Sequence, residues 1–266
     1  MTPLGAAVQG VGLVGPGLAS WSQGEPLLGG GAPWRWAETV VPPPQCLPPA
    51  ERRRTPASVR LALAVGLEAT ADAGADAARL AAVFSSSAGD GQNCHEICEV
   101  LASSERLISP TRFHNSVHNA AAGYWGIATG STATSNALCA YDASFGAGLL
   151  EALTQVHTER VPVLLVAYDT VHPEPLRRAR PVPEAFGVAL VLAPEDAGGS
   201  RARLTARFTS APATALAEPR LEALRAAVPA ARSLPLLAQL ARRAAGEVVL
   251  EYLAPLQLAV EVSVCP

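Results

Sequence analysis

The chain has 266 residues, 49% of them hydrophobic, which is enough to bury one substantial core. Its formal net charge is -3 and all of its basic residues are arginines, which excludes a strongly basic surface for nucleic acid and a lysine nucleophile or base. The sequence contains no apolar run long enough for a membrane span, and its first residues lack the basic start of a signal peptide. We therefore expect a soluble, cytoplasmic, single globular unit with reduced thiols.

The first third of the chain predicts strands alternating with helices. Three consecutive prolines after the first strand exclude regular structure there, whereas Thr55 and Pro56 suit the N-cap and the first position of an alanine-rich helix. The predicted elements are a buried strand at Val8–Val14, an irregular stretch at Gly17–Glu51, a helix from Thr55 to Gly74, a buried strand at Leu80–Ser86, a turn at Gly89–Gly91 and a helix near Asn93–Ser104.

The remaining two-thirds continue this alternation. Val161–Ala167 is the clearest strand, because a nearly continuous apolar run between turn signals is typical of a sheet covered on both faces. The other predicted elements are a loop and helix within Ser109–Gly130, a strand at Thr132–Cys139, a helix at Ala143–Thr158, strands at Phe186–Ala193 and Arg201–Thr209 joined by an Asp196–Gly199 turn, and, within Pro219–Pro266, one or two helices before a hairpin of Glu247–Tyr252 and Leu256–Val264. The pattern indicates an α/β layered fold.

Six segments, in order, resemble the β-ketoacyl synthase family of condensing enzymes. They are VQGVGLVGPGLASWSQGEPLLGG, ASVRLALAVGLEATADAG, Leu80–Asp90, the Ser109-Pro110 pair with Asn119, Gly123 and Gly130, Val163–Tyr168, and FGVALVLAPEDAGGSRARLTARF. The resemblance implies a thiolase-like α/β fold, a layered mixed sheet covered by helices that corresponds to the N-terminal half of the family, with the second half truncated. It divides the chain into a ketosynthase-like N-terminal domain, residues 1–210, and a short appendage of helix and β-hairpin, residues 211–266, packed on the same core.

The resemblance also locates the position of the family's nucleophilic cysteine. In that family the cysteine stands 33 residues after the serine of the Ser-Pro pair, and from Ser109 this count reaches Asp142 without a gap. Ser144 then occupies the small polar position two residues later. Cys139 stands three residues early, within the predicted strand. We therefore expect Asp142 to replace the nucleophile.

An aspartate at this position predicts a loss of catalysis. Condensation needs a thiolate activated at a helix N-terminus, and a carboxylate neither forms a useful thioester nor tolerates a malonyl carboxylate nearby. The family also uses two histidines and a lysine from its C-terminal half, yet no histidine follows His172 here. We expect Asp142 to be a helix N-cap or a first-turn acid that stabilises its helix by about 0.5–2 kcal/mol, and Cys139 to be a small buried hydrophobic residue.

Several other residues have both a possible functional role and an ordinary structural one. His114 and His118 are four apart on a predicted helix, a spacing that can hold zinc, but no third ligand is evident, so we expect a packing or interface role and no metal. Cys94 and Cys98 fit a surface helix. Arg52–Arg54 fit either a solvated loop or a contact with an acidic carrier protein. Tyr124 and Trp125 fit either an interface or the core, and the sequence favours neither alternative.

The resemblance further implies a partner. Family members dimerise through the strand before the nucleophile, and chain-length factors are inert homologues that pair with a complete ketosynthase and shape its acyl tunnel. SVHNAAAGYW, ASFGAGLLEA and VPVLLVAYD resemble the half-length subunits of aryl polyene (xanthomonadin-like) biosynthesis. We expect a heterodimer that acts on carrier-protein-bound chains, without a cofactor. The candidate interface or tunnel residues are His114, His118, Asn119, Tyr124, Trp125 and Phe145.

Two rival functions remain open from the sequence. One is a minimal acyltransferase or hydrolase that uses Cys139 as nucleophile with His114 or His118 as base. The other is a homodimeric acyl-binding scaffold that needs no ketosynthase. The first predicts that a thiol-directed acyl probe labels Cys139, and the second predicts a folded homodimer in the absence of any partner.

Overall fold

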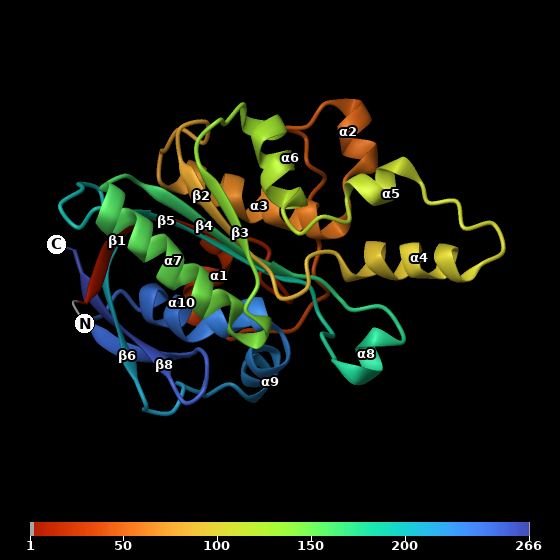
Figure 1. The fold of residues 1–266 in the computed structure, drawn as a ribbon. Helices are drawn as coiled ribbons and strands as arrows, with labels where there is room; N and C mark the ends of the chain where they lie inside the picture. The colour runs from red at the N-terminus through yellow and green to blue at the C-terminus, as the bar shows by residue number, and fades with distance from the viewer. Residues whose placement is uncertain (1–2, 266) are drawn as a thin grey trace.

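The computed structural model describes residues 3–265 and shows, within them, one eight-stranded mixed sheet between two layers of helices (Figure 1). The sheet order is β3-β2-β4-β5-β1-β6-β8-β7. The strands are β1 Leu4–Val14, β2 Ala81–Ser85, β3 Ser135–Leu138, β4 Val163–Asp169, β5 Phe186–Ala193, β6 Ala202–Thr209, β7 Gly246–Glu251 and β8 Gln257–Val264.

The helices cover both faces of the sheet. They are α1 Trp21–Leu28, α2 Pro49–Arg54, α3 Ala57–Asp72, α4 Gly91–Ala102, α5 Pro110–His114, α6 Ala120–Thr129, α7 Ser144–Glu159, α8 Leu176–Ala179, α9 Pro219–Ala227 and α10 Leu234–Ala241, with 3-10 turns η1 Tyr141–Ala143 and η2 Pro229–Ser233. Helices α3 and α6 pack on one face, and α7, α10 and η2 on the other. Helix α4 projects from the body (Figure 1).

The central strands explain how one sheet supports two cores. Every residue of β4 and β5 is buried, as the apolar run at Val161–Ala167 predicts. Alternate side chains of β4 enter opposite cores: Val163 and Leu165 pack against α7 and η2, whereas Leu164 and Val166 pack against α3 and α6. This is the period-two pleat of a strand covered on both faces.

Strand β1 lies unusually close to helix α3. A Cβ atom on Gly12 would come within 2.0 Å of the Val65 carbonyl oxygen, so only glycine fits there. Beyond Val8, where its pairing with β6 ends, β1 donates its Val11 and Leu13 backbone N–H groups to the Asp72 and Glu68 carboxylates of α3. Acidic side chains of α3 thus replace the missing strand partner.

Two local expectations are wrong. Strands β5 and β6 do not pair as a hairpin, because β1 lies between them and pairs antiparallel with both. Thr55 is not the N-cap of α3, since its hydroxyl donates to the Glu51 carbonyl within α2 and Pro56 takes the cap position. The short helix α1 lies inside the stretch at Gly17–Glu51, within the first of the segments that resemble the family.

The predicted C-terminal hairpin is confirmed. Strands β7 and β8 pair antiparallel, and β8 also pairs with β6, so the hairpin extends the main sheet. The boundary at residues 210 and 211 stays a prediction. Within residues 3–265, none of the helices combines the length and the hydropathy that a bilayer crossing requires.

Candidate functional site

A tight turn between β3 and α7 presents Asp142 at the start of the helix. Tyr141 has a φ of 52°, in the left-handed region that non-glycine residues seldom adopt. The Ser144 hydroxyl holds the turn: it donates to the Tyr141 carbonyl at 2.7 Å and accepts the Ala140 N–H at 3.1 Å. A residue held in this backbone conformation needs such local support. The Ser144 hydroxyl therefore ties the residues before Asp142 to the start of α7.

Two arginines bind the Asp142 carboxylate. Arg180, from the connection between β4 and β5, lies 2.8 Å from Oδ1, and Arg232, from η2, lies 3.3 Å from Oδ2. Both guanidinium side chains are only 16% exposed, and Arg180 also stacks over the Tyr141 ring, 3.7 Å from its centroid. The carboxylate thus joins three segments that are far apart in the chain.

Asp142 is an acid in the first turn of η1, directly before α7, and its side chain is not an N-cap. Among the described residues, no side chain caps η1 or α7, and the N-cap position of α7 belongs to Ala143. The Asp142 carboxylate turns instead toward Arg180 and Arg232, because two partly buried guanidinium groups bind an anion more strongly than exposed backbone N–H groups do. The ion network continues from Arg232 to Glu251, from Glu251 to Arg225, and from Arg225 to Glu222, at 2.6, 3.2 and 2.6 Å.

A buried carboxylate positions the walls of this site. Asp169, at the end of β4, accepts the Ser87 N–H at 2.9 Å, the Ser87 hydroxyl at 2.6 Å and the Ala230 N–H at 2.8 Å. Burial raises the pKa of the Asp169 carboxyl, and the hydrogen bonds from Ser87 oppose that rise. Ala230 lies two residues before Arg232, so Asp169 fixes the turn that carries one of the two arginines.

Removing the charge of Asp142 should leave the two arginines without their anion. For Asp142→Asn we expect the free energy of unfolding to fall by about 1–2 kcal/mol, because the pair is partly buried. The matched control is Asp196→Asn, which removes an equally direct but exposed pair with Arg160 and should cost within about 0.5 kcal/mol. Thermal unfolding followed by scanning fluorimetry measures both; equal effects would contradict the anchoring role.

Cys139 is exposed, so the expectation of a buried residue is wrong for this chain. It follows β3, which is the edge strand of the sheet, and its Sγ contacts the Ser87 carbonyl at 3.2 Å. The His118 Nε2 contacts the neighbouring Ser86 carbonyl, also at 3.2 Å. In the part of the chain that the structure describes, no hydrogen bond joins Cys139 to a histidine.

The two histidines do not share a helix, contrary to the prediction. His114 ends α5 and packs edge-on against the Tyr124 ring, whereas His118 lies in the turn before α6. Asn115 and the following turn break the helix between them. Among residues 3–265, no group of three or more His, Cys, Asp and Glu side chains is arranged to hold a metal ion.

The aromatic candidates lie in the core. Tyr124 and Trp125 are each 2% exposed, on the α6 face that packs against α3, and Phe145, in the first turn of α7, is 1% exposed. Of the alternatives left open for Tyr124 and Trp125, the structure shows core burial. Asn119 is exposed at the N-cap position of α6, where its side chain makes no cap hydrogen bond.

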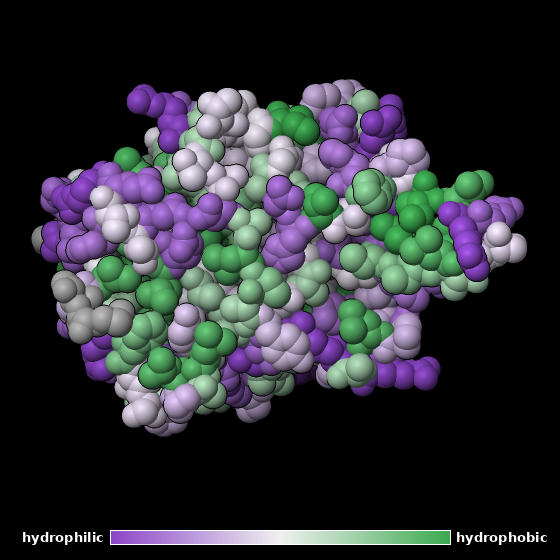
Figure 2. Space-filling model, viewed as in Figure 1, coloured by the Kyte–Doolittle hydropathy of each residue, from purple (hydrophilic) through white to green (hydrophobic). Residues whose placement is uncertain are grey.

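Apolar side chains gather at the end of the molecule that α4 and α5 form (Figure 2). Leu107 and Phe113 are 79% and 68% exposed, and Leu101, Val117 and Ile127 are each about half exposed. The α4 helix itself buries only Gly91 and Asn93. Large contiguous apolar surface of this kind is typical of a protein–protein interface.

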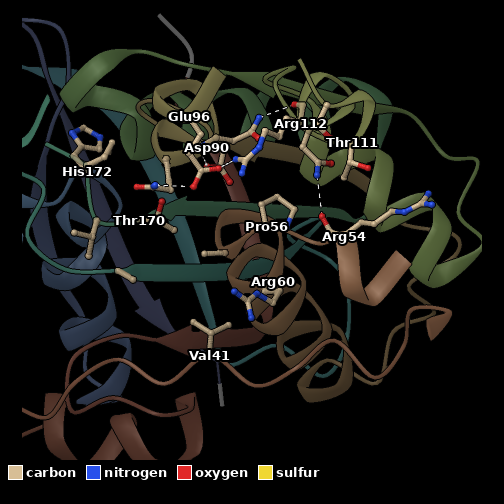
Figure 3. Close-up of a pocket in the computed structure, with 18 of the residues that line it drawn as sticks. Val41, Arg54, Pro56, Arg60, Asp90, Glu96, Thr111, Arg112, Thr170 and His172 are labelled. Carbon is tan, nitrogen blue, oxygen red and sulfur yellow. Dashed lines mark hydrogen bonds and ion pairs between the residues drawn. The ribbon is translucent and has the colours of Figure 1, made fainter. Parts of the chain in front are cut away.

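A cavity of about 880 Å³ opens beside this region, between the start of α3, α4, α5 and the connection after β4. Figure 3 shows Arg60 on one side of the opening and the Arg112–Glu96 ion pair on the other, with Asp90 beside that pair. The expected surface helix around Cys94 and Cys98 is confirmed, since both thiols are exposed on α4.

Comparison with known proteins now identifies the chain's family. A family model for the N-terminal domain of β-ketoacyl synthases matches residues 29–250. The chain belongs to the β-ketoacyl synthase family. The expected thiolase-like α/β fold is thereby confirmed, and Asp142 stands at the strand-to-helix turn that the motif count assigns to the nucleophile. A comparison with curated proteins finds no match.

Three solved structures resemble the whole chain. A chain from the ketosynthase ApeO in complex with its chain length factor ApeC from Xenorhabdus doucetiae is 25% identical, with a TM-score of 0.74 over 97% of this chain and 99% of that chain. The ishigamide ketosynthase/chain length factor is 14% identical, with a TM-score of 0.72 and full coverage of both chains. The AntDE:AntF complex, a type II polyketide acyl-carrier protein with its ketosynthase, is 10% identical, with a TM-score of 0.76 over 99% and 100% of the two chains. The last two show a common fold.

Proposed function

We propose that this chain is a non-catalytic, chain-length-factor-like subunit that pairs with a complete β-ketoacyl synthase. The observation that carries the proposal is Asp142, a carboxylate at the family's nucleophile position that two arginines bind. A carboxylate so neutralised is a poor nucleophile, and it fills the place where a thiolate would accept an acyl group. The likeness to a chain of a ketosynthase–chain length factor complex supports the same role.

We place the partner against the free edge of β3 and the apolar end formed by α4 and α5. The Ala82 and Ser86 N–H groups donate to the Thr134 and Leu138 carbonyls, so these positions of β3 face β2. Backbone groups alternate in direction along a strand, so Ser135 and Ala137 face away from the sheet. A partner strand that paired there would continue the sheet and cover an exposed edge.

In this proposal the subunit helps shape the tunnel for an acyl chain that grows on a carrier protein in the cytoplasm. His114, His118 and Asn119 lie outside the hydrophobic core and are the predicted residues available to contact the partner or the chain. Tyr124, Trp125 and Phe145 act only through the core that they fill. We assign the aryl polyene class of product from the sequence resemblance.

Co-expression with a complete β-ketoacyl synthase from the same organism tests the pairing. We expect a 1:1 complex on size-exclusion chromatography and low solubility of this chain alone, because the apolar end and the β3 edge are then uncovered. Absence of any complex would overturn the proposal. A soluble, folded homodimer of this chain alone would favour the scaffold function instead.

The exposed thiol of Cys139 supports one rival, an acyltransferase or hydrolase. We expect a thioester-based acyl probe to leave Cys139 unlabelled in the complex, because no described histidine is hydrogen-bonded to its Sγ to remove the proton. Intact-protein mass spectrometry of the wild type and of Cys139→Ala measures this. Labelling of the wild type at Cys139, together with loss of a hydrolase activity in Cys139→Ala, would favour the rival.

A further inference from the structure

The two edges of the sheet differ in how far their backbone groups are covered. Strand β3 is one edge, where Ser135 and Ala137 face away from the sheet. Strand β7 is the opposite edge and, among the described strands, pairs only with β8. An edge strand with free backbone groups can pair with a strand of another chain unless it is covered or charged. The outward groups of β7 therefore decide whether the sheet can be extended at both ends.

Val249 lies on the outward side of β7, and Thr214 occupies its backbone groups. The Thr214 N–H donates to the Val249 carbonyl at 2.8 Å, and the Val249 N–H donates to the Thr214 hydroxyl, also at 2.8 Å. In an antiparallel strand the N–H and C=O groups of one residue point to the same side. Both groups of Val249 therefore point away from β8, and a single residue between β6 and α9 satisfies them.

The other outward positions of β7 are Glu247 and Glu251, two residues before and after Val249. Glu247 is exposed and pairs with Arg207 at 2.7 Å, which places charged groups on this part of the edge. A Cβ atom on Gly146 would lie 2.7 Å from the Glu251 carbonyl oxygen, so the first turn of α7 covers the end of the strand. Charge and steric cover of this kind prevent edge strands from pairing.

The connection that carries Thr214 is held in place on both sides of β7. It runs from the end of β6 to the start of α9 without being a strand of the sheet. The Leu216 side chain packs against the hydrophobic core, and the Leu216 N–H donates to the Glu222 carboxylate at 2.8 Å. Glu222 in turn pairs with Arg225. Residues 210–218 thus form a strap that lies along β7.

We propose that this strap guards the β7 edge, so that no strand of a second copy of this chain can pair there. A second copy is the partner to exclude, because two identical edges can pair antiparallel about a two-fold axis. With β7 occupied, the sheet can be extended at β3 alone. The inference concerns β7 and does not depend on the proposed pairing with a ketosynthase.

Substitutions at Thr214 should open the edge in steps. Thr214→Pro removes both hydrogen bonds with Val249, because proline has neither an N–H nor a hydroxyl, whereas Thr214→Val removes only the hydroxyl acceptor. Hydrogen exchange of the Val249 amide, in the ketosynthase complex or in the full chain if no complex forms, measures the opening. We expect exchange at least about tenfold faster in both variants than in the wild type. Thr214→Ser keeps both groups and is the matched control, so its rate should not change.

Self-association distinguishes a guarded edge from a connection that only stabilises the fold. Analytical ultracentrifugation at rising concentration should show assemblies larger than the wild-type species for Thr214→Pro, and none for Thr214→Ser. Exchange of the Val249 amide in Thr214→Pro should slow again as the concentration rises, because a strand of the second copy then covers it. Measurement well below the melting temperature of every variant separates pairing from unfolding.

Three outcomes would overturn the inference. One is a Val249 amide that exchanges as slowly in Thr214→Pro and Thr214→Val as in the wild type. Another is faster exchange without any larger assembly over the same concentration range, which shows that an open β7 edge does not pair. The third is an assembly of Thr214→Pro in which Val249 exchange stays fast, which places the contact elsewhere. If Thr214→Pro does not fold, Thr214→Val supplies the same comparison.

Discussion

Replacing Ala137 by proline should greatly weaken the proposed complex with the ketosynthase while the chain itself stays folded. The N–H of Ala137 faces away from β2, so proline there removes no hydrogen bond of the sheet but blocks a partner strand from pairing at the edge. We expect the affinity to fall by about a hundredfold or more, equal to about 2.7 kcal/mol, since a backbone donor is lost and a ring intrudes. Size-exclusion chromatography and calorimetry of the co-expressed pair measure this loss.

Two control variants separate pairing from folding. Ala137→Ser keeps the backbone N–H and should retain the complex. Asn136→Pro removes a donor that faces β2 and should lower the melting temperature of the chain, which Ala137→Pro should not do. Normal complex formation by Ala137→Pro would show that the partner does not extend the sheet at β3.

Replacing Gly12 by alanine should unfold the chain or nearly so. The new Cβ would lie 2.0 Å from the Val65 carbonyl oxygen and 2.9 Å from the Ala69 nitrogen, both backbone atoms of α3. Strand and helix must then move apart, and the backbone contacts between β1 and α3 are lost. We expect a cost of at least about 3 kcal/mol, a large part of the stability of a typical domain.

The control for this prediction is Gly198→Ala, in the turn after β5, where an added Cβ meets no atom within 4 Å. Its effect should stay within about 0.5 kcal/mol. Soluble yield and thermal melting of the two variants, expressed with the partner, give the comparison. Similar yields and melting temperatures for Gly12→Ala and Gly198→Ala would show that β1 and α3 are not in close contact.

Local sequence signals were sufficient for most of the secondary structure. The apolar run at Val161–Ala167 predicts a buried strand because burial on both faces excludes polar residues, and β4 is such a strand. The order of the strands in the sheet, in contrast, cannot be predicted from local sequence. Nothing near Phe186–Ala193 or Arg201–Thr209 indicates that β1 lies between these strands, because strand pairing depends on contacts distant in sequence.

In the candidate site, too, local features are predictable from the sequence and contacts between distant segments are not. Motif spacing places Asp142 at the turn before α7, since spacing is local information. It says nothing of Arg180 and Arg232, which approach the carboxylate from segments 38 and 90 residues further along the chain. The spacing predicts an N-cap or a first-turn acid, and Asp142 is a first-turn acid, but the two arginines that bind its carboxylate become its neighbours only through the fold.

Intact-protein mass spectrometry of the heterodimer after incubation with an acylated carrier protein tests the central claim most directly. The account predicts an acyl adduct on the ketosynthase alone, with none on this chain, in the wild type and in Cys139→Ala alike. Asp142→Cys should gain no condensing activity, because among residues 3–265 the side chains that bind position 142 are Arg180 and Arg232, neither of which can act as a histidine base. An adduct on this chain that is lost in Cys139→Ala, with condensation that falls in parallel, would contradict the account.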